Sequence, residues 1–231
     1  MGYSVTWSVF ENGEALAEGL AGHVAEVLET AVARRGVALL AVSGGTTPAR
    51  FFRALSAAMI PWPKVIVTLV DERLVDESSP RSNAGLVRAN LLQRSAAAAT
   101  FVPLFTHGQT AEAVAEAADL VLRNQPWPLD VAVLGMGADG HTASFFPDAR
   151  GLDTLLDPSS GRLVLPVHAE SAGEPRLTLS LPALANAGLP VVHIEGKAKR
   201  KVLEEVISGA DAPIGRVLAA ARQTPAIYWA P

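Results

Sequence analysis

The sequence predicts an α/β fold, Rossmann-like, in which helices flank both faces of a largely parallel sheet. Short apolar runs alternate with helical patterns along the chain, which is typical of parallel strands joined by crossover helices. The runs are nearly continuous in apolar residues, as expected for strands covered on both faces. With 231 residues, of which 49% are hydrophobic and 18% charged, the chain can bury a sizeable core. We expect a single domain over residues 1–231.

The strands and helices can be placed in order from these patterns. The clearest strand candidates are the runs Val37–Val42, Val65–Val70, Asp130–Leu134 and Val191–Ile194. Apolar residues at helical spacing predict helices over Glu14–Arg35, Ser82–Arg94, Ala111–Arg123 and Lys197–Ile207. Ser82 and Asn83 are favourable capping residues. Arg176 opens an alternating run that predicts a further strand, and AIYWAP predicts a short last one.

Composition limits the possible partners. The formal net charge of −4 gives no broad electrostatic reason to bind nucleic acid or an anionic membrane. The absence of cysteine excludes disulfides and thiolate catalysis, and it fits a reducing compartment. The N-terminus lacks a signal-peptide pattern, and no apolar run approaches the roughly 20 residues that span a bilayer. We therefore expect a cytoplasmic protein, monomeric or weakly dimeric, with a small-molecule partner.

A polar or glycine-rich cluster follows each of the four strand candidates. In chain order the clusters are SGGTTP, DERLVDESSPRSN, GMGADGH and EGKAK. In an open parallel sheet, ligands bind outside the carboxyl ends of the strands. The sequence therefore predicts that these four clusters converge on one ligand site.

The first cluster suits a phosphate. Its glycines allow backbone N–H groups to approach a ligand, its threonines add hydroxyl donors, and Pro48 is expected to open a helix whose N-terminus attracts negative charge. The P-loop lysine is missing, which argues against a nucleoside triphosphate. An ordinary turn that caps a helix fits the same letters equally well. The residues concerned are Ser43, Gly44, Gly45, Thr46 and Thr47.

The third cluster matches the dinucleotide pattern G-x-G-x-x-G, but its other residues disfavour that function. Asp139 would oppose phosphate charge, and Pro147 limits the following helix to roughly two turns. His141 would instead lie near a helix N-terminus, where the dipole favours the neutral imidazole. A neutral imidazole at a ligand site can act as a general base, and Asp139 can orient it. None of the other histidines, His23, His107, His168 and His193, forms a metal-ligand spacing.

Charged residues at two further positions have both a structural and a functional interpretation. Asp71, Glu72 and Arg73 follow a strand, where they are either solvated or arranged to orient a ligand. Basic residues open the helix at 197–207, where they oppose the helix dipole. A bound anion would relieve that conflict, with Lys199 or Lys197 as its partner.

Taken together, the motifs resemble the 6-phosphogluconolactonase family. The matching motifs occur in the family's order over residues 42–203 and are VSGGTTP, VDERLV, GMGADGHTASFFP, RLTLSLPAL and GKAKRKVL. The dipeptide SN also matches, and it begins eleven residues after the start of the Asp-Glu-Arg triplet. The resemblance implies a Rossmann-like fold without a metal or nucleotide cofactor. It also implies hydrolysis of 6-phospho-D-glucono-1,5-lactone to 6-phosphogluconate in the pentose phosphate pathway.

The resemblance further implies roles for individual residues. His141 is expected to be the general base that activates water, with Asp139 in support. N–H groups around Gly137–Gly140 would stabilise the oxyanion. Arg73, Arg176 and Lys199 are expected to bind the phosphate or other polar groups, with the division among them left open. Asp71, Gly137 and the SGGTTP backbone complete the expected substrate site.

Two alternatives remain. Glucosamine-6-phosphate deaminases or isomerases share the fold and similar loops, but they typically carry an acid soon after the D-G-H stretch. Here the residues are Thr142 to Pro147, TASFFP, without a glutamate. A non-catalytic sugar-phosphate sensor would bind the ligand without turnover, and no DNA-binding helix pair accompanies the predicted domain.

Overall fold

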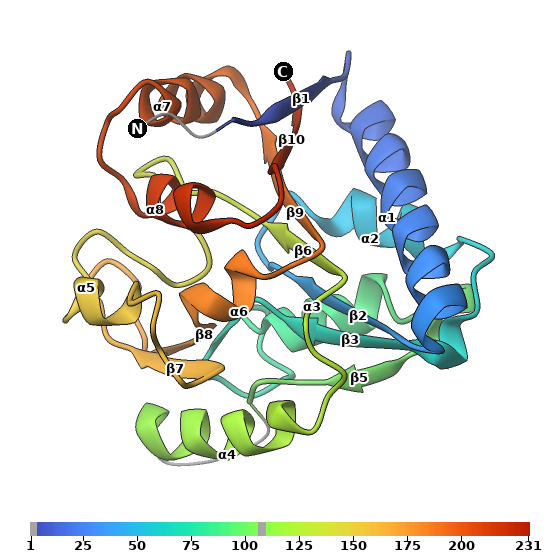
Figure 1. The fold of residues 1–231 in the computed structure, drawn as a ribbon, viewed down its shortest axis with the longest axis horizontal. Coiled ribbons are helices and arrows are strands. Elements are labelled where there is room, and N and C mark those ends of the chain that lie inside the picture. Colours follow the sequence, from blue (N-terminus) through green and yellow to red (C-terminus); the bar gives the residue numbers. More distant parts are fainter. Residues whose placement is uncertain (1–3, 106–109) are drawn as a thin grey trace.

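The computed structural model describes residues 4–105 and 110–231, and its centre is a parallel sheet of seven strands (Figure 1). Their bounds are β1 Thr6–Val9, β2 Ala38–Val42, β3 Val65–Leu69, β5 Thr100–Val102, β6 Val131–Leu134, β9 Leu189–Glu195 and β10 Ala226–Ala230. The strands lie in the order β1-β10-β9-β6-β2-β3-β5, and every neighbouring pair is parallel. The predicted parallel sheet is confirmed, and the four predicted strands differ from the observed ones by one or two residues at their ends.

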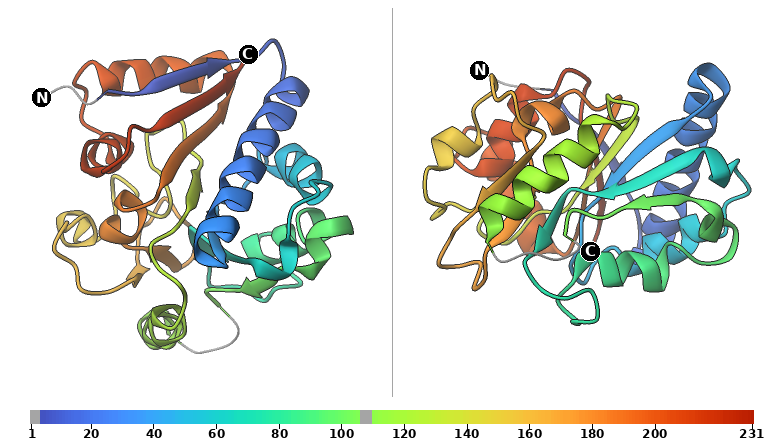
Figure 2. Two further views of the ribbon diagram at one scale, coloured as in Figure 1. Left: turned by 45° about the vertical axis from the view of Figure 1, so that its right-hand side comes forward. Right: turned by 90° about the horizontal axis from the view of Figure 1, so that it is seen from below.

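Helices cover both faces of this sheet, as the apolar runs predicted (Figure 2). Their bounds are α1 Gly13–Arg35, α2 Ala49–Ser56, α3 Asn83–Asn90, α4 Ala111–Arg123, α5 Leu152–Leu155, α6 Leu181–Ala185, α7 Lys197–Ile207 and α8 Pro213–Ala220. Because strand side chains alternate, Tyr228 of β10 joins the cluster beneath α1, while its neighbours Ile227 and Trp229 join the cluster beneath α7 and α8. His23 on α1 is half-buried, and its Nδ1 lies 2.6 Å from the Tyr228 hydroxyl.

The helix predicted over Ser82–Arg94 is shorter than expected. Ser82 caps it as predicted, since its hydroxyl accepts from the Gly85 N–H. The helix ends at Asn90, whose side-chain amide donates to the Leu86 carbonyl, and Gln93 similarly donates to the Arg88 carbonyl. Arg88 is among the last four residues, whose carbonyls have no partner within the helix, so Gln93 satisfies one of them. A short 3₁₀ helix, Arg94–Ala98, follows.

A second, antiparallel sheet lies beyond the carboxyl end of β3. It contains β4 Asp71–Arg73, β7 Val164–Val167 and β8 Arg176–Leu179 in the order β4-β8-β7. Val70 joins the two sheets, because its N–H donates to Val42 of β2 and its carbonyl accepts from Leu179 of β8. The strand predicted to begin at Arg176 is thus confirmed and is brought beside the end of β3.

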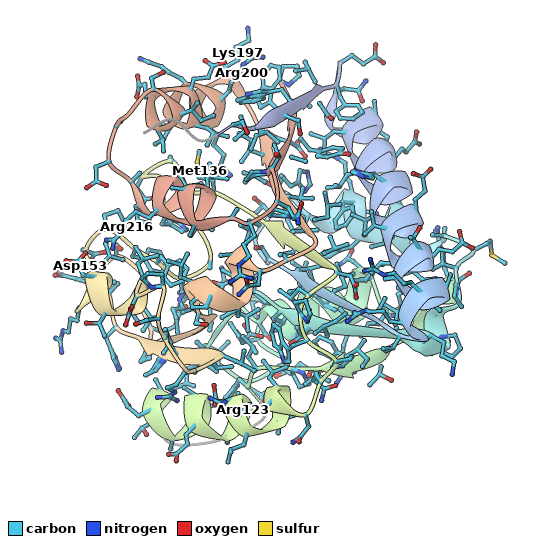
Figure 3. The ribbon with its side chains drawn as sticks, viewed as in Figure 1. Arg123, Met136, Asp153, Lys197, Arg200 and Arg216 are labelled. Atoms are coloured by element: carbon cyan, nitrogen blue, oxygen red, sulfur yellow. The ribbon has the colours of Figure 1, made fainter. Side chains whose placement is uncertain are left out.

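The segment at 148–174 contains α5 and β7. Asp153 of α5 accepts a hydrogen bond of 2.6 Å from Arg216 of α8, and the two residues are labelled in Figure 3. The same segment is also bonded to α4. Asp119 of α4 accepts from the N–H groups of Leu163 and Val164, and Val164 is the first residue of β7. Within residues 4–105 and 110–231, no helix is long and apolar enough to cross a membrane.

Candidate active site

The four predicted clusters converge on one cavity of about 350 Å³ at the carboxyl ends of β2, β3, β6 and β9. The predicted convergence of the clusters is confirmed, and the cavity lies where ligands bind in open parallel sheets. That it is the ligand site stays a prediction. All but one of the predicted site residues line the cavity, and the exception, Asp139, lies behind His141. The lining residues among them are Ser43, Gly44, Gly45, Thr46, Thr47, Asp71, Arg73, Gly137, His141, Arg176 and Lys199.

The SGGTTP loop presents backbone donors to this cavity. The N–H groups of residues 44–47 have no hydrogen-bond partner in the part of the chain that the structure describes. Gly45 has a φ of +99°, which only glycine adopts readily, and a Cβ at Gly44 would overlap the Asn83 side chain. The helix α2 follows directly after Pro48, with neither a side-chain cap nor an acidic residue in its first turn. Its N-terminus is therefore open to an anion.

Lys199 is the basic residue of α7 that reaches the cavity. It lies in the first turn of the helix, and no ion pair involves it among the described residues. Arg200 stacks over Trp229 with its guanidinium carbon 4.4 Å from the ring centroid, and its Nε donates to Glu204. Figure 3 shows Lys197 and Arg200 at the start of α7, on the side of β1 and β10. Of the two lysines weighed from the sequence, Lys199 is thus the one that lines the cavity.

Arg73 and Arg176 form a second cationic group at the cavity. They are direct partners across the antiparallel strands β4 and β8. The Nε atom of each is buried without a hydrogen-bond partner. Burial and the charge of Arg73 lower the pKa of Arg176 from its ordinary value. Among the described lining residues, three cations therefore face a single carboxylate, that of Asp71, in a chain whose net charge is −4.

Asp71 is held in place by its surroundings. Its side chain accepts a hydrogen bond of 2.7 Å from the Ser144 hydroxyl, and its carbonyl accepts one of 2.8 Å from the Asn83 amide. The adjacent Glu72 is not a ligand residue. Its carboxylate is buried and accepts from the N–H groups of Arg73, Asn83 and Ala84, so it fixes the start of α3 against β4. Burial raises the pKa of Glu72.

His141 and Asp139 form a hydrogen-bonded pair at the rim of the cavity. Asp139 Oδ1 lies 2.6 Å from Nδ1 of His141 and also accepts from its backbone N–H. The imidazole packs against Phe146, with ring centroids 4.5 Å apart. Because an ionised Asp139 accepts from Nδ1–H, the basic lone pair of the imidazole lies on Nε2. A Cβ at Gly137 would overlap both side chains, which explains the glycine there.

The expected helix after His141 is absent, so the helix-dipole argument for this residue is wrong. The chain instead makes tight turns: the Gly137 N–H donates to the His141 carbonyl, and the Thr142 hydroxyl donates to the Gly135 carbonyl. Ala143 adopts a φ of +50° in a third turn, which the Phe145 N–H closes by donating to the Thr142 carbonyl. The Gly137 and Gly140 N–H groups are both used in these turns. Of the four N–H groups in the expected range 137–140, these two are therefore not available to an oxyanion, whereas those of Ala138 and Asp139 have no partner among the described residues.

Ten of the lining residues were not predicted as site residues, and four of these carry polar or aromatic side chains. The four are Asn83, Phe146, Ser171 and His193. Asn83 was interpreted as a helix cap and as part of the SN family motif, without a role in the site. His193 carries a signal that could have found it, because it is a polar residue near the carboxyl end of the apolar run VVHI. Burial, with Lys199 and Arg50 nearby, lowers the pKa of His193 to about 4.

No group of three or more His, Asp or Glu side chains in residues 4–105 and 110–231 could hold a metal ion. His107, which has no metal-ligand spacing in the sequence, lies outside the described residues.

Comparisons with known proteins agree with the motifs. A family model described as glucosamine-6-phosphate isomerases/6-phosphogluconolactonase matches residues 11–229. A 6-phosphogluconolactonase of Mesorhizobium japonicum is 58% identical over 100% of this chain and 97% of its own length. One of Rhizobium meliloti is 50% identical over 99% of this chain and 100% of its own. The crystal structure of a 6-phosphogluconolactonase from Shewanella baltica superposes with a TM-score of 0.94 at 38% identity, covering 100% of both chains. This chain belongs to the glucosamine-6-phosphate isomerase/6-phosphogluconolactonase family.

Proposed function

We propose that this protein hydrolyses 6-phospho-D-glucono-1,5-lactone to 6-phospho-D-gluconate, the lactone-opening step of the oxidative pentose phosphate pathway. The observation that carries the proposal is the position of the His141–Asp139 pair at the rim of a cavity lined by Arg73, Arg176 and Lys199. A base beside a cationic cavity suits an anionic substrate that must be attacked by water. The relatives named 6-phosphogluconolactonase support the same activity.

The substrate is bound through its phosphate and hydroxyl groups. The free N–H groups of residues 44–47 and the three cations supply the donors that a phosphate dianion requires. Asp71, fixed by Ser144, is the one carboxylate of the lining and accepts from a sugar hydroxyl. Binding holds the lactone carbonyl near His141.

Hydrolysis proceeds by attack of water on C1. Nε2 of His141 takes a proton from the water as its oxygen bonds to C1, and Asp139 stabilises the imidazolium that forms. The carbonyl oxygen becomes an oxyanion, for which the N–H groups of Ala138 and Asp139 are the available donors. The imidazolium then returns the proton to the ring oxygen as the C1–O bond breaks. A lactone is an activated ester, so this path needs no covalent nucleophile and no metal.

An assay with freshly prepared lactone tests the proposal. Acid release is followed at constant pH against the spontaneous rate, and a saturable acceleration by the protein is expected. Ammonia release from glucosamine 6-phosphate is measured in parallel as the alternative, and we expect none. The TASFFP turn supplies no acid for that chemistry. Tight binding of the lactone without acceleration would identify a sensor and contradict the proposal.

A further inference from the structure

Glu174 connects two arginines beside the cavity. Its carboxylate is 13% exposed and forms ion pairs with Arg81 through Oε2 and with Arg176 through Oε1, the latter at 3.3 Å. The same terminal nitrogen of Arg176, Nη2, donates to the Ala172 carbonyl at 2.9 Å. Glu174 does not itself line the cavity.

These contacts restrain one edge of Arg176 and leave another free. Nη2 donates to the Ala172 carbonyl and lies 3.3 Å from Glu174 Oε1, which it pairs with by charge and not by a hydrogen bond. Nε is buried and has no partner among the described residues. Arg73 shows the same arrangement, because its Nη1 donates to the Arg81 carbonyl while its Nε is unpartnered. An unpaired buried donor is costly, and an anion in the cavity removes that cost.

We propose that Glu174 is a positioning residue that holds the Arg176 guanidinium so that its free N–H edge is ready for the substrate phosphate. Arg81 anchors Glu174 from the outer side. The inference rests on the proposed function for the identity of the anion, but the arrangement of the arginines is independent of turnover.

An opposite role for Glu174 is physically reasonable and can be distinguished. A carboxylate beside two arginines reduces the positive potential of the site. If this were the main effect of Glu174, removing Glu174 would strengthen anion binding. If Glu174 orients Arg176, its removal weakens binding, because the long side chain must then be ordered when the phosphate binds. Ordering one such side chain costs about 2- to 10-fold in affinity.

The experiment compares Glu174→Ala, Glu174→Gln and the control Glu170→Ala, which removes an exposed carboxylate from the same segment. Binding of inorganic phosphate and of 6-phosphogluconate is measured by calorimetry, and folding is checked by thermal melts. We expect Glu174→Ala to weaken both ligands by about 2- to 10-fold. Glu174→Gln keeps the side-chain length but removes the charge that pairs with both arginines, so it should weaken binding in the same direction as Glu174→Ala. The control should stay within about twofold of wild type. Tighter binding in both Glu174 variants, or no change in either, overturns the proposal.

Kinetics supply the second readout. Glu174→Ala should raise the KM for the phosphorylated lactone and leave kcat nearly unchanged, with no effect on unphosphorylated glucono-1,5-lactone. Equal losses on both lactones would indicate general damage and overturn the positioning role. Arg81→Gln, at a side chain that is 57% exposed, should reproduce the Glu174→Ala pattern even if the latter folds poorly. Failure of the wild type to hydrolyse either lactone would refute the proposed function, while the calorimetry would still test Glu174.

Discussion

Arg73 and Arg176 face each other directly across strands β4 and β8, and each has a buried Nε without a partner. Like charges opposite one another destabilise an antiparallel pair. Burial and the charge of Arg73 both lower the pKa of Arg176, as expected for two like charges held close together. A dianion between the two guanidinium groups would offset the repulsion between them, so we expect phosphate to stabilise the folded protein.

The first prediction concerns this pair. Arg73→Gln should leave the phosphate-free protein as stable as wild type or more stable by about 0.2–1 kcal/mol, because a like-charge contact is removed. It should also reduce the rise in Tm that added phosphate produces, since binding to the folded state stabilises by mass action. Thermal melts with and without phosphate measure both effects. If added phosphate raises the Tm of Arg73→Gln as much as that of wild type, Arg73 does not contribute to phosphate binding.

The second prediction concerns Lys199, which no carboxylate pairs with among the described residues. Lys199→Ala should lower kcat/KM for the phosphorylated lactone more than for glucono-1,5-lactone, because the loss of a charge-assisted contact costs about 1.5–3 kcal/mol only where the phosphate is present. Lys201→Ala is the matched control, since Lys201 is 78% exposed and lies on the same helix. Equal effects of Lys199→Ala on the two substrates would argue against a phosphate contact.

The third prediction concerns the pH dependence of stability. The pKa of His193 falls from 6.5 to about 4 on folding. Between pH 6.5 and about pH 4, His193 is protonated in the unfolded chain but not in the folded protein. The free energy of unfolding therefore decreases as the pH falls through this window. The shift corresponds to roughly 3 kcal/mol. Denaturation of His193→Gln between pH 4 and 7 should therefore show a flatter dependence than wild type.

His23→Gln, outside the cavity, is the control for this experiment. A pH dependence that is unchanged in His193→Gln would show that other groups produce it.

The fourth prediction concerns Glu72. Its carboxylate accepts hydrogen bonds of 2.7–2.8 Å from three backbone N–H groups. In Glu72→Gln, the side-chain NH2 group would replace one of the two accepting oxygens and would face a backbone N–H. Glu72→Gln should destabilise the fold by about 1–3 kcal/mol, the cost of leaving buried donors unsatisfied. Chemical denaturation measures it, with Glu77→Gln, a half-exposed ion-pair residue, as control. A loss no larger than that of the control would be contrary to a role in anchoring α3.

The sequence predicted the parts of the site that depend on local pattern. Strands such as β2 and β6 are continuous apolar runs, and the polar residues after them must meet at one edge once the strands are parallel. This pattern predicts that Ser43, His141 and Lys199 meet at one edge of the sheet, and in the structure all three line one cavity. The family motifs added the expected roles of these residues.

What the sequence did not predict depends on long-range contacts. The opposition of Arg73 and Arg176 follows from an antiparallel register between segments far apart in the chain, and neither segment encodes that register by itself. The turn after His141 is fixed by Thr142 bonding back to Gly135, which competes with helix formation in a way that a residue pattern does not reveal. Glu174 gains its significance only when Arg81 and Arg176 are brought to it.

The rate of acid release from fresh 6-phosphogluconolactone, compared between wild type and His141→Gln at equal amounts of folded protein, tests the central claim most directly. Removing the base should lower kcat by about 10²- to 10⁴-fold, while the KM and the affinity for 6-phosphogluconate remain near those of wild type. A His141→Gln variant that turns over the lactone within a few-fold of the wild-type rate would contradict the mechanism.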